Sequence, residues 1–519
     1  MQYDLVFQGG GAKGMAFVGA IAEFERRQHS FRRLVGTSAG AINAALIAAG
    51  YTAEDMAQAL GETIEGTDRP IFESFMVPPT LDELNTVKLN DSMLIKLTKL
   101  IPRLYKVFET YPEFTTLAIA QGGFDLIKNG LESLGVEVDE AWWKGNAASI
   151  YSLLELGGWY SANNFVTWLE RKLDEKDPRF GGATLGSLYQ MTGNDLSVCV
   201  TDITGAKLLV LNHRTAPNLP VIWAVRMSMS IPFVWPAVTW KSTWGTYTEG
   251  NQEHVLTDHR IVDGGALSNF ALRLTSTSGA EVKAVMANDP DISDDEFAQF
   301  TAKAPTIGFM LDSNIEVPNA GEAPESEGLA AGIETFTHWI GENGNSNNFF
   351  TTAGEVLSTM MVGNDNFLLS HLEDNVCRLP VGNIGTLEFA MSDKRKTALV
   401  KAAKDATRDF FDARLEFTVN ELFMAVNENG KFEIGANITG EAHSRDWIGL
   451  FKSPEDAENN VERGNWTYVG SDETVFETIT EAQLGQYEAR YYAFGSRGLF
   501  GNQFRLIKRT GPLNRVVAR

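Results

Sequence analysis

The chain has 519 residues, of which 44% are hydrophobic and 21% charged, an ordinary globular composition. At about 150 residues per domain, this length predicts roughly three domains, or one large domain with an appendage. The formal net charge of −23 argues against a nucleic-acid partner, because binding phosphates requires a basic surface. It also means that contact with an anionic membrane needs a local basic or apolar patch.

The two cysteines, Cys199 and Cys377, exclude a disulfide framework and a cysteine-based zinc site, and they favour a reducing cytoplasm. The N-terminus lacks the basic start, apolar run and small-residue cleavage site of a secretory signal. No apolar run is long enough to predict a membrane-spanning helix. We therefore expect a cytoplasmic protein, with peripheral membrane contact left open. Secretion by a signal-peptide-independent route would leave no such mark and also stays open.

The N-terminal region alternates strands and helices. Residues 3–8 form an apolar run that ends in glycines, as a buried parallel strand does, and residues 14–27 have helical periodicity. A second strand is predicted at 31–35 and a helix of small residues at 39–49. Thr52 begins the capping box of a third helix. This order, with short connections, predicts a parallel sheet covered by helices.

Two later regions have a different sequence pattern. From about 70 to 180 the pattern turns to long helical stretches, which we interpret as a cap-like insertion in a catalytic domain spanning 1–410. Further elements are predicted within that domain: strands at 196–201, 207–211, 254–262 and 282–286, and a helix at 392–411. After about residue 415, short alternating runs between turns predict an all-β accessory domain, most simply a sandwich over 415–519.

The first chemical motif is a G-x-S-x-G sequence at 36–40, between a predicted strand and a predicted helix. Gly36 and Gly40 allow a sharp turn that holds Ser38 above the sheet edge. The serine also lies at a helix N-terminus, where free N–H groups favour developing negative charge. Ser38 is therefore the candidate nucleophile, and the strand–turn–helix setting is more specific than the five residues alone.

The second motif is the glycine turn at residues 9–14, Gly-Gly-Gly-Ala-Lys-Gly. Its glycines fit a dinucleotide fingerprint, but that fold needs an acidic residue about 20 positions later, at the end of the second strand. The second strand ends instead at Ser38, so the cofactor interpretation fails. What remains is a run of N–H groups suited to a tetrahedral oxyanion, at Gly9, Gly10 and Gly11, followed by Gly14. Lys13 either adds positive potential there or is a solvated residue at the start of a helix.

The third motif is Ile-Val-Asp-Gly-Gly at 261–265, which carries Asp263 from a strand into a turn formed by Gly264 and Gly265. Alone, this is the pattern of an ordinary β-turn aspartate. It indicates chemistry only in combination with the other two motifs.

In this order, the three motifs resemble the patatin-like phospholipase family, whose marks are a glycine-rich anion-hole loop, G-x-S-x-G and D-G-G/A. The resemblance implies an α/β fold with a patatin-like parallel-sheet core. It also implies a Ser–Asp dyad without a histidine, metal or cofactor: Ser38 attacks the ester carbonyl, Asp263 takes its proton, and amides around Gly10 and Gly11 hold the oxyanion. Residues 200–205 are also similar, and 226–232 look like the family's S-x-x-x-P segment. The similarity covers roughly residues 1–300.

The implied activity is that of a lipolytic serine esterase of phospholipase A type, which cleaves fatty-acyl esters of membrane lipids. Two alternatives stay open: an acyltransferase that uses the same dyad, and a catalytically silent lipid- or protein-binding relative. A Ser–His–Asp triad would need a histidine after the acid, leaving His338, His371 and His443, none of which lies in a recognisable strand-end turn. The large cap and the appended domain also leave open a requirement for an activating protein partner.

Residues 93–108 combine an apolar helical row with a basic row formed by Lys96, Lys99, Arg103 and Lys106. A basic amphipathic helix in an acidic protein could dock on anionic headgroups. The alternative, slightly favoured, is a cap helix whose apolar side packs on the core.

Overall fold

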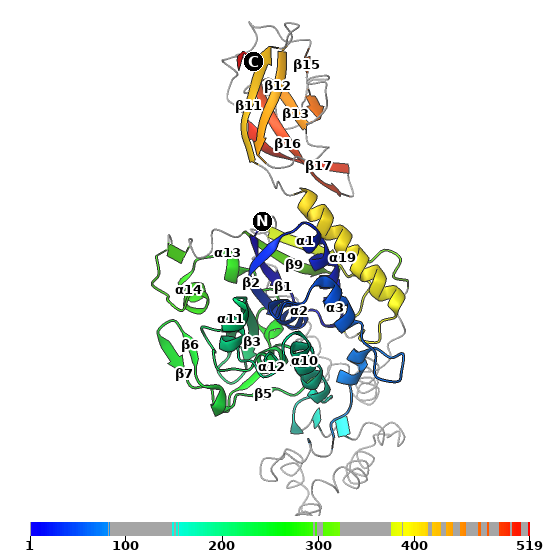
Figure 1. Cartoon of the computed structure of the whole chain (residues 1–519), viewed down its shortest axis with the longest axis vertical. Helices are drawn as coiled ribbons and strands as arrows, with labels where there is room; N and C mark the ends of the chain where they lie inside the picture. Colours follow the sequence, from blue (N-terminus) through cyan, green and yellow to red (C-terminus); the bar gives the residue numbers. More distant parts are fainter. Residues whose placement is uncertain are drawn as a thin grey trace, which may run out of the picture. The chain divides into compact units, whose positions relative to one another are not determined.

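The computed structural model describes residues 2–80, 155–293, 305–321, 375–386 and 388–413, a few short pieces between them, and the strands that follow residue 417. The chain divides into two compact units, Met1–Lys404 and Asp405–Arg519. Figure 1 shows the elements of both units in sequence colours.

The first unit begins with the predicted alternation of strands and helices. The Thr52 side chain accepts a bond from the Asp55 amide, and the Asp55 carboxylate accepts one from the Thr52 amide, which completes the predicted capping box. The elements are β1 (Gln2–Phe7), the short 3-10 helix η1 (Gly11–Met15), α1 (Ala16–Arg26), β2 (Ser30–Thr37), α2 (Ala39–Ala48) and α3 (Ala53–Leu60).

These strands belong to a sheet with the order β10-β9-β1-β2-β3-β8-β5, in which β4 also pairs with β3. Its other strands are β3 (Asp195–Asp202), β4 (Lys207–Leu211), β5 (Val238–Thr239), β8 (Arg260–Asp263), β9 (Thr306–Asp312) and β10 (Val376–Pro380). The α/β prediction is confirmed, with neighbours from β10 to β3 pairing in parallel. The sheet is mixed, however, because β4, β8 and β5 join it antiparallel. The β3–β4 connection is too short for the crossover that a parallel pair requires.

One strand prediction was wrong and another only partly right. Residues 282–286 lie in a helix, α14 (Ala280–Met286). Val282, Val285 and Met286 follow the i, i+3, i+4 spacing of one helical face and enter the same buried cluster, so their apolar run reflects helical burial. The predicted strand at 254–262 is interrupted by a turn between β7 (Gln252–His254) and β8.

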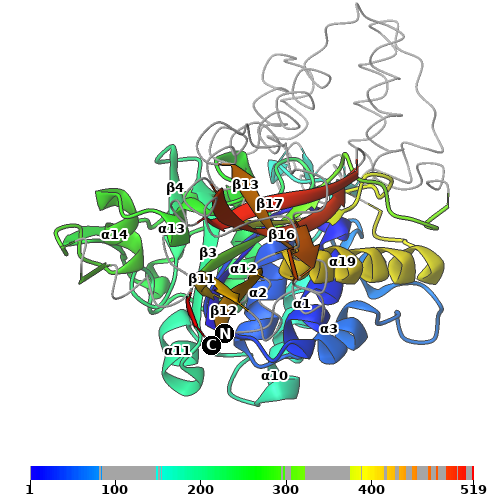
Figure 2. The same ribbon diagram turned by 90° about the horizontal axis from the view of Figure 1, so that it is seen from above.

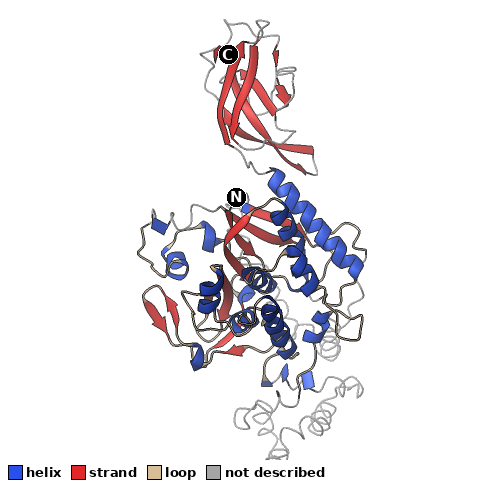
Figure 3. Ribbon diagram, in the orientation of Figure 1, coloured by secondary structure: helices blue, strands red, loops and turns tan. Residues whose placement is uncertain are grey.

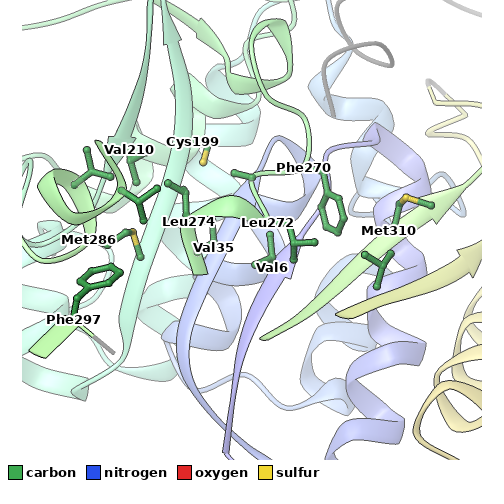
Figure 4. Close-up of a cluster of buried hydrophobic side chains, with 14 residues drawn as sticks. Val6, Val35, Cys199, Val210, Phe270, Leu272, Leu274, Met286, Phe297 and Met310 are labelled. Atoms are coloured by element: carbon green, nitrogen blue, oxygen red, sulfur yellow. The ribbon is translucent and has the colours of Figure 1, made fainter. Parts of the chain in front are cut away.

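The two faces of the sheet are buried by different parts of the chain. On one face, Val6, Val35, Cys199 and Met310 from four strands meet the segment from Phe270 to Met286 in one cluster (Figure 4). That segment contains α13 (Arg273–Ser276) and α14. Alternation along β1 turns the next residue to the other side, where Phe7 contacts Phe17 of α1 with ring centroids 5.3 Å apart.

Helix α19 (Asp393–Ala413) confirms the predicted helix near 392–411. It lies beside α1, where a Cβ on Gly19 would come within 2.0 Å of the Val400 carbonyl oxygen. Figures 1 and 2 show α1, α2, α3 and α19 gathered together.

Most of the predicted insertion at 70–180 lies outside the described residues, and so does the segment 93–108. The helices described in it are the 3-10 helix η2 (Ile71–Phe75) and α10 (Asn163–Lys176). Phe75 packs edge-on against Phe165, with ring centroids 5.4 Å apart. The chain continues through α11 (Leu185–Thr192), α12 (Val221–Ser228), the 3-10 helix η4 (Ser242–Trp244), β6 (Tyr247–Glu249), β7 and the 3-10 helix η5 (Gly264–Ala266).

In the second unit, the elements described after α19 are all strands (Figure 3). They form two four-stranded sheets, β15-β12-β11-β18 and β14-β13-β16-β17. The bounds are β11 (Thr418–Val426), β12 (Phe432–Thr439), β13 (Trp447–Lys452), β14 (Trp466–Tyr468), β15 (Val475–Phe476), β16 (Tyr487–Gly498), β17 (Gly501–Arg509) and β18 (Val517–Ala518). The sandwich-type accessory domain and the predicted domain limits stay predictions.

Candidate active site

Ser38 stands in a strained turn between β2 and α2. Its backbone has φ 53° and ψ −123°, a conformation that costs a non-glycine residue roughly 1–3 kcal/mol. Close packing on both sides holds this turn. A Cβ on Gly36 would lie 2.4 Å from the Gly40 carbonyl oxygen, and one on Gly40 would lie 2.3 Å from that of Phe7. Glycine is therefore required at both flanking positions of the motif.

Strand β3 brings Asp263 next to this turn. Thr37, the residue before Ser38, pairs with Cys199 of β3. Asp263, the last residue of β8, pairs with Val200, the next position on β3. Gly264 allows the close approach, because a Cβ there would lie 2.4 Å from the Cys199 carbonyl oxygen. The sheet register thus brings together the two side chains that the sequence predicted as a pair.

The Asp263 carboxyl group is buried, and burial raises its pKa to about 7, against the lowering effect of hydrogen bonds from the Ser38 hydroxyl and the Gly265 amide. Its Oδ1 accepts the Gly265 amide at 2.7 Å. The Asp263 Oδ2 atom accepts no hydrogen bond of normal geometry from the described residues. A carboxyl group with a pKa near neutrality and a spare acceptor beside a serine is suited to general-base chemistry.

The segment 226–232 supports the backbone of both residues. Ser228 accepts a hydrogen bond from the Ser38 amide at 2.9 Å and donates one to the Cys199 carbonyl at 2.7 Å. The Asp263 amide donates to the Ser230 carbonyl at 3.0 Å. The sequence indicated this segment as part of the site, but it gave no role to Ser228.

The glycine loop is tied down at both ends. The Gly9 amide donates to the Asn269 carbonyl at 2.9 Å, and the Asn269 side chain donates back to the Gly9 carbonyl at 3.1 Å. The Ala12 amide donates to the Thr386 carbonyl at 2.9 Å. Asn269 and Thr386 were not predicted from the sequence, because neither lies in a motif.

Between these two anchors, Gly10 is the N-cap of η1 and Gly11 its first residue. Amides at these positions have no partner inside a helix, and neither donates to another described residue. Of the three glycines predicted as oxyanion donors, only Gly10 and Gly11 therefore stay candidates, since the Gly9 amide already donates to the Asn269 carbonyl.

The two other motif residues of this loop have structural partners. The Lys13 ammonium donates to the Ser313 hydroxyl at 3.1 Å, and burial lowers its pKa. Lys13 is therefore not a freely solvated helix-start residue. Gly14 lets η1 approach α2, because a Cβ there would lie 2.8 Å from that of Ala39.

Ser38 and Gly11 open into a pocket of about 710 Å³, part of which is open to solvent. Most of the lining residues are apolar, and none of them is a histidine. The lining residues are Gly11, Ala12, Gly14, Met15, Ser38, Ala39, Ile42, Asn43, Leu60, Phe72, Phe75, Phe165, Met229, Ile231, Trp235, Glu388, Phe389, Met391 and Lys396. The histidines of the triad alternative, His338, His371 and His443, lie outside the described residues. Within the described parts of the chain, no group of three or more His, Cys, Asp or Glu side chains could hold a metal ion.

Comparison with known proteins identifies the family of the chain. The family model described as patatin-like phospholipase matches residues 5–275, a region that includes Ser38 and Asp263. The chain belongs to this family. At the family level it is thus a lipolytic hydrolase, and its α/β fold is the one expected.

A curated relative of this patatin-like chain is the uncharacterized protein YqhO of Bacillus subtilis, which is 27% identical over 418 residues, or 79% of this chain and 98% of the relative. Among solved structures, VipD from Legionella pneumophila is 16% identical, with a TM-score of 0.33 over 79% of this chain and 66% of that one. The type III effector ExoU is also 16% identical, with a TM-score of 0.31 over 79% of this chain and 52% of that one. This chain thus spans about half to two thirds of the two solved structures. None of the described helices is both long and apolar enough to cross a membrane.

Proposed function

We propose that this patatin-like protein is a phospholipase A-type acyl hydrolase that uses Ser38 as nucleophile and Asp263 as base. Ser38 attacks the carbonyl carbon of a fatty-acyl ester, and its proton passes to Asp263. The amides of Gly10 and Gly11 donate hydrogen bonds to the oxyanion. Collapse of the tetrahedral intermediate releases the lysolipid alcohol, which takes the proton back from Asp263. Water, giving a proton to Asp263, then cleaves the acyl-serine ester to release the fatty acid and restore Ser38.

The observation that carries the proposal is the position of the strained serine on the lining of an apolar pocket, with Asp263 beside it. Ser38 itself is nearly buried, so it is reached from the pocket. Asp263 is separately aligned by β3 and can accept the proton at neutral pH, because burial raises its pKa to about 7. The surrounding side chains include Phe72, Phe75 and Trp235, whose apolar surfaces favour a hydrocarbon chain over a sugar or a charged leaving group.

The first test compares wild type with Ser38→Ala on vesicles of mixed phospholipids, with released fatty acids and lysolipids followed by mass spectrometry. We expect release by wild type only. Ser276→Ala is the matched control, because the Ser276 hydroxyl bonds to the Leu272 carbonyl and does not line the pocket. Equal release from wild type and Ser38→Ala would overturn the assignment of the nucleophile.

A second arm separates chemistry from membrane access. A fluorophosphonate probe phosphonylates an activated serine and releases fluoride, so peptide mapping should find the label on Ser38. Labelling without lipid release would indicate a different ester or a missing activating partner. The absence of both labelling and release would support a silent relative. Adding an alcohol acceptor to the vesicle assay distinguishes hydrolysis from acyl transfer, because a transferase yields the new ester in preference to the free fatty acid.

A further inference from the structure

One wall of the pocket comes from a part of the chain outside the region matched by the family. Glu388, Phe389, Met391 and Lys396 all line the pocket, although the family match ends at residue 275. The same segment also fixes the glycine loop, since the Thr386 carbonyl accepts the Ala12 amide at 2.9 Å. This wall therefore belongs to the site although the family model does not match it, which makes it a candidate specificity element.

The wall carries two charged side chains, Glu388 and Lys396, and only Glu388 has a buried counter-ion close to it. Glu388 is held by Arg395, with Nε to Oε1 at 2.5 Å and Nη2 to Oε2 at 2.9 Å. Its Oε2 also accepts the Gly385 amide at 2.9 Å. Both members of this ion pair are at least 93% buried. Glu388 is thus fully partnered and offers little net charge to the pocket.

Lys396 differs from Glu388 in this respect. Its side chain is only 14% exposed, yet the single ion pair found for it among the described residues joins Nζ to Asp393 Oδ1 at 3.4 Å, and that carboxylate is 98% exposed. A pair with a solvated carboxylate contributes little. Lys396 therefore brings a weakly compensated positive charge to the lining of an apolar pocket that also contains Ser38.

We infer that Lys396 selects substrates by binding the phosphodiester of a glycerophospholipid whose acyl ester lies at Ser38. This inference rests on the proposed function and names a residue that selects its substrate. In a glycerophospholipid, the phosphate is a few bonds from the scissile ester, so an anion and an acyl chain enter the pocket together. A protein with a net charge of −23 repels anionic lipids at long range, so a cation on the pocket lining offsets that repulsion near the site where the ester binds.

The test compares wild type, Lys396→Gln, Lys396→Arg and the control Lys394→Gln in neutral detergent micelles. Lys394 carries the same charge in the same turn of α19, but its side chain is exposed and does not line the pocket. The substrates are a phosphatidylglycerol, a diacylglycerol with the same acyl chains, and a short neutral ester in solution. The readout is the ratio of kcat/KM for the phospholipid to that for the diacylglycerol.

We expect Lys396→Gln to lower this ratio about tenfold, the effect of losing one charge-assisted hydrogen bond. Lys396→Arg should retain most of the ratio, and Lys394→Gln should leave it unchanged. An unchanged ratio in Lys396→Gln, or an equal fall in Lys394→Gln, overturns the inference while hydrolysis of the soluble ester still upholds the proposed function. If wild type cleaves neither the lipids nor the soluble ester, the proposed function and this inference fail together.

Discussion

The pocket has two sides that are built in different ways. The three turns at 9–14, 36–40 and 263–265 are fixed by directed hydrogen bonds and by backbone atoms in close contact. The apolar wall is fixed by ring packing, and its members are Phe72, Phe75, Phe165, Trp235 and Phe389. Groups held by directed hydrogen bonds and close backbone contacts have a single arrangement, whereas packed rings can adopt several arrangements of similar energy. We therefore expect changes in the three turns to abolish turnover and changes in the wall to alter which substrate is turned over.

The strongest test of the three turns is Asp263→Asn. It removes the proposed base, and we expect kcat to fall about 10³-fold, because general-base catalysis contributes on this scale. Steady-state rates on a soluble ester measure the loss. Asp258→Asn, on an exposed turn just before β8, is the matched control and should retain full activity. A comparable loss in the control, or normal turnover in Asp263→Asn, would contradict the assignment.

The same substitution should stabilise the protein at alkaline pH. Because the folded-state pKa of Asp263 is raised to about 7, above the value near 3.9 of an unfolded chain, its ionisation opposes folding. This destabilisation is absent below about pH 4, grows as the pH rises toward 7 and is complete above it. Asp263→Asn should therefore melt at a higher temperature than wild type at pH 8, and the difference should vanish near pH 4. A lower melting temperature at pH 8 would show that the carboxylate stabilises the fold.

The pH dependence of wild-type catalysis follows from the same group. Only the ionised Asp263 accepts a proton, so kcat/KM should rise about tenfold per pH unit below 7 and level off above it. A pH–rate profile on an uncharged soluble ester gives the apparent pKa without a contribution from the substrate. A profile that is flat between pH 5 and 8 would exclude a base with this pKa.

The contrast between the two sides also explains what could be predicted from the sequence. Ser38, Asp263 and the glycine loop lie in short contiguous motifs, because each turn depends on its immediate neighbours. Their pairing came from the family resemblance and not from the expected parallel sheet. β8 is antiparallel to β3, and Asp263 lies near Ser38 because β3 continues beyond its pair with Thr37. The α/β core was predictable for the same local reason, apart from α14, whose apolar residues allowed either a strand or a helix.

The apolar wall could not be predicted in this way. Phe72, Phe165 and Phe389 are far apart in the sequence and belong to no motif, and only tertiary packing brings their rings together. Asn269, Thr386 and Ser228 were missed as anchors for a related reason. Their bonds to the three turns cross long stretches of chain, so no local spacing marks them.

Ser228→Ala tests whether an anchor outside the three turns supports them. The change removes the acceptor of the Ser38 amide and the donor to the Cys199 carbonyl. Leaving buried polar groups without partners should lower the free energy of unfolding by about 1–3 kcal/mol. We also expect kcat to fall about tenfold, because a small displacement of the Ser38 turn degrades alignment. Ser276→Ala, which removes a hydroxyl bonded to the Leu272 carbonyl, is the control. A loss of stability without a change in kcat would make Ser228 purely structural.

The smallest effect on turnover should come from the apolar wall's neighbour Ile42. Ile42 lies one turn after Ser38 on α2, is half-buried and lines the pocket. Ile42→Trp adds bulk to open space, so the core should tolerate it better than overpacking of a closed site, which costs about 1–3 kcal/mol. We expect short acyl esters to retain most of their kcat/KM, and long-chain esters to lose several-fold because the indole occupies the space of the distal methylenes. Ile42→Val, which enlarges the pocket slightly, is the control and should leave the chain-length profile close to that of wild type. An equal loss for all chain lengths would mean that the space beside Ile42 does not receive the acyl chain. It would contradict the view that the three turns determine turnover and the apolar wall determines which substrate is cleaved.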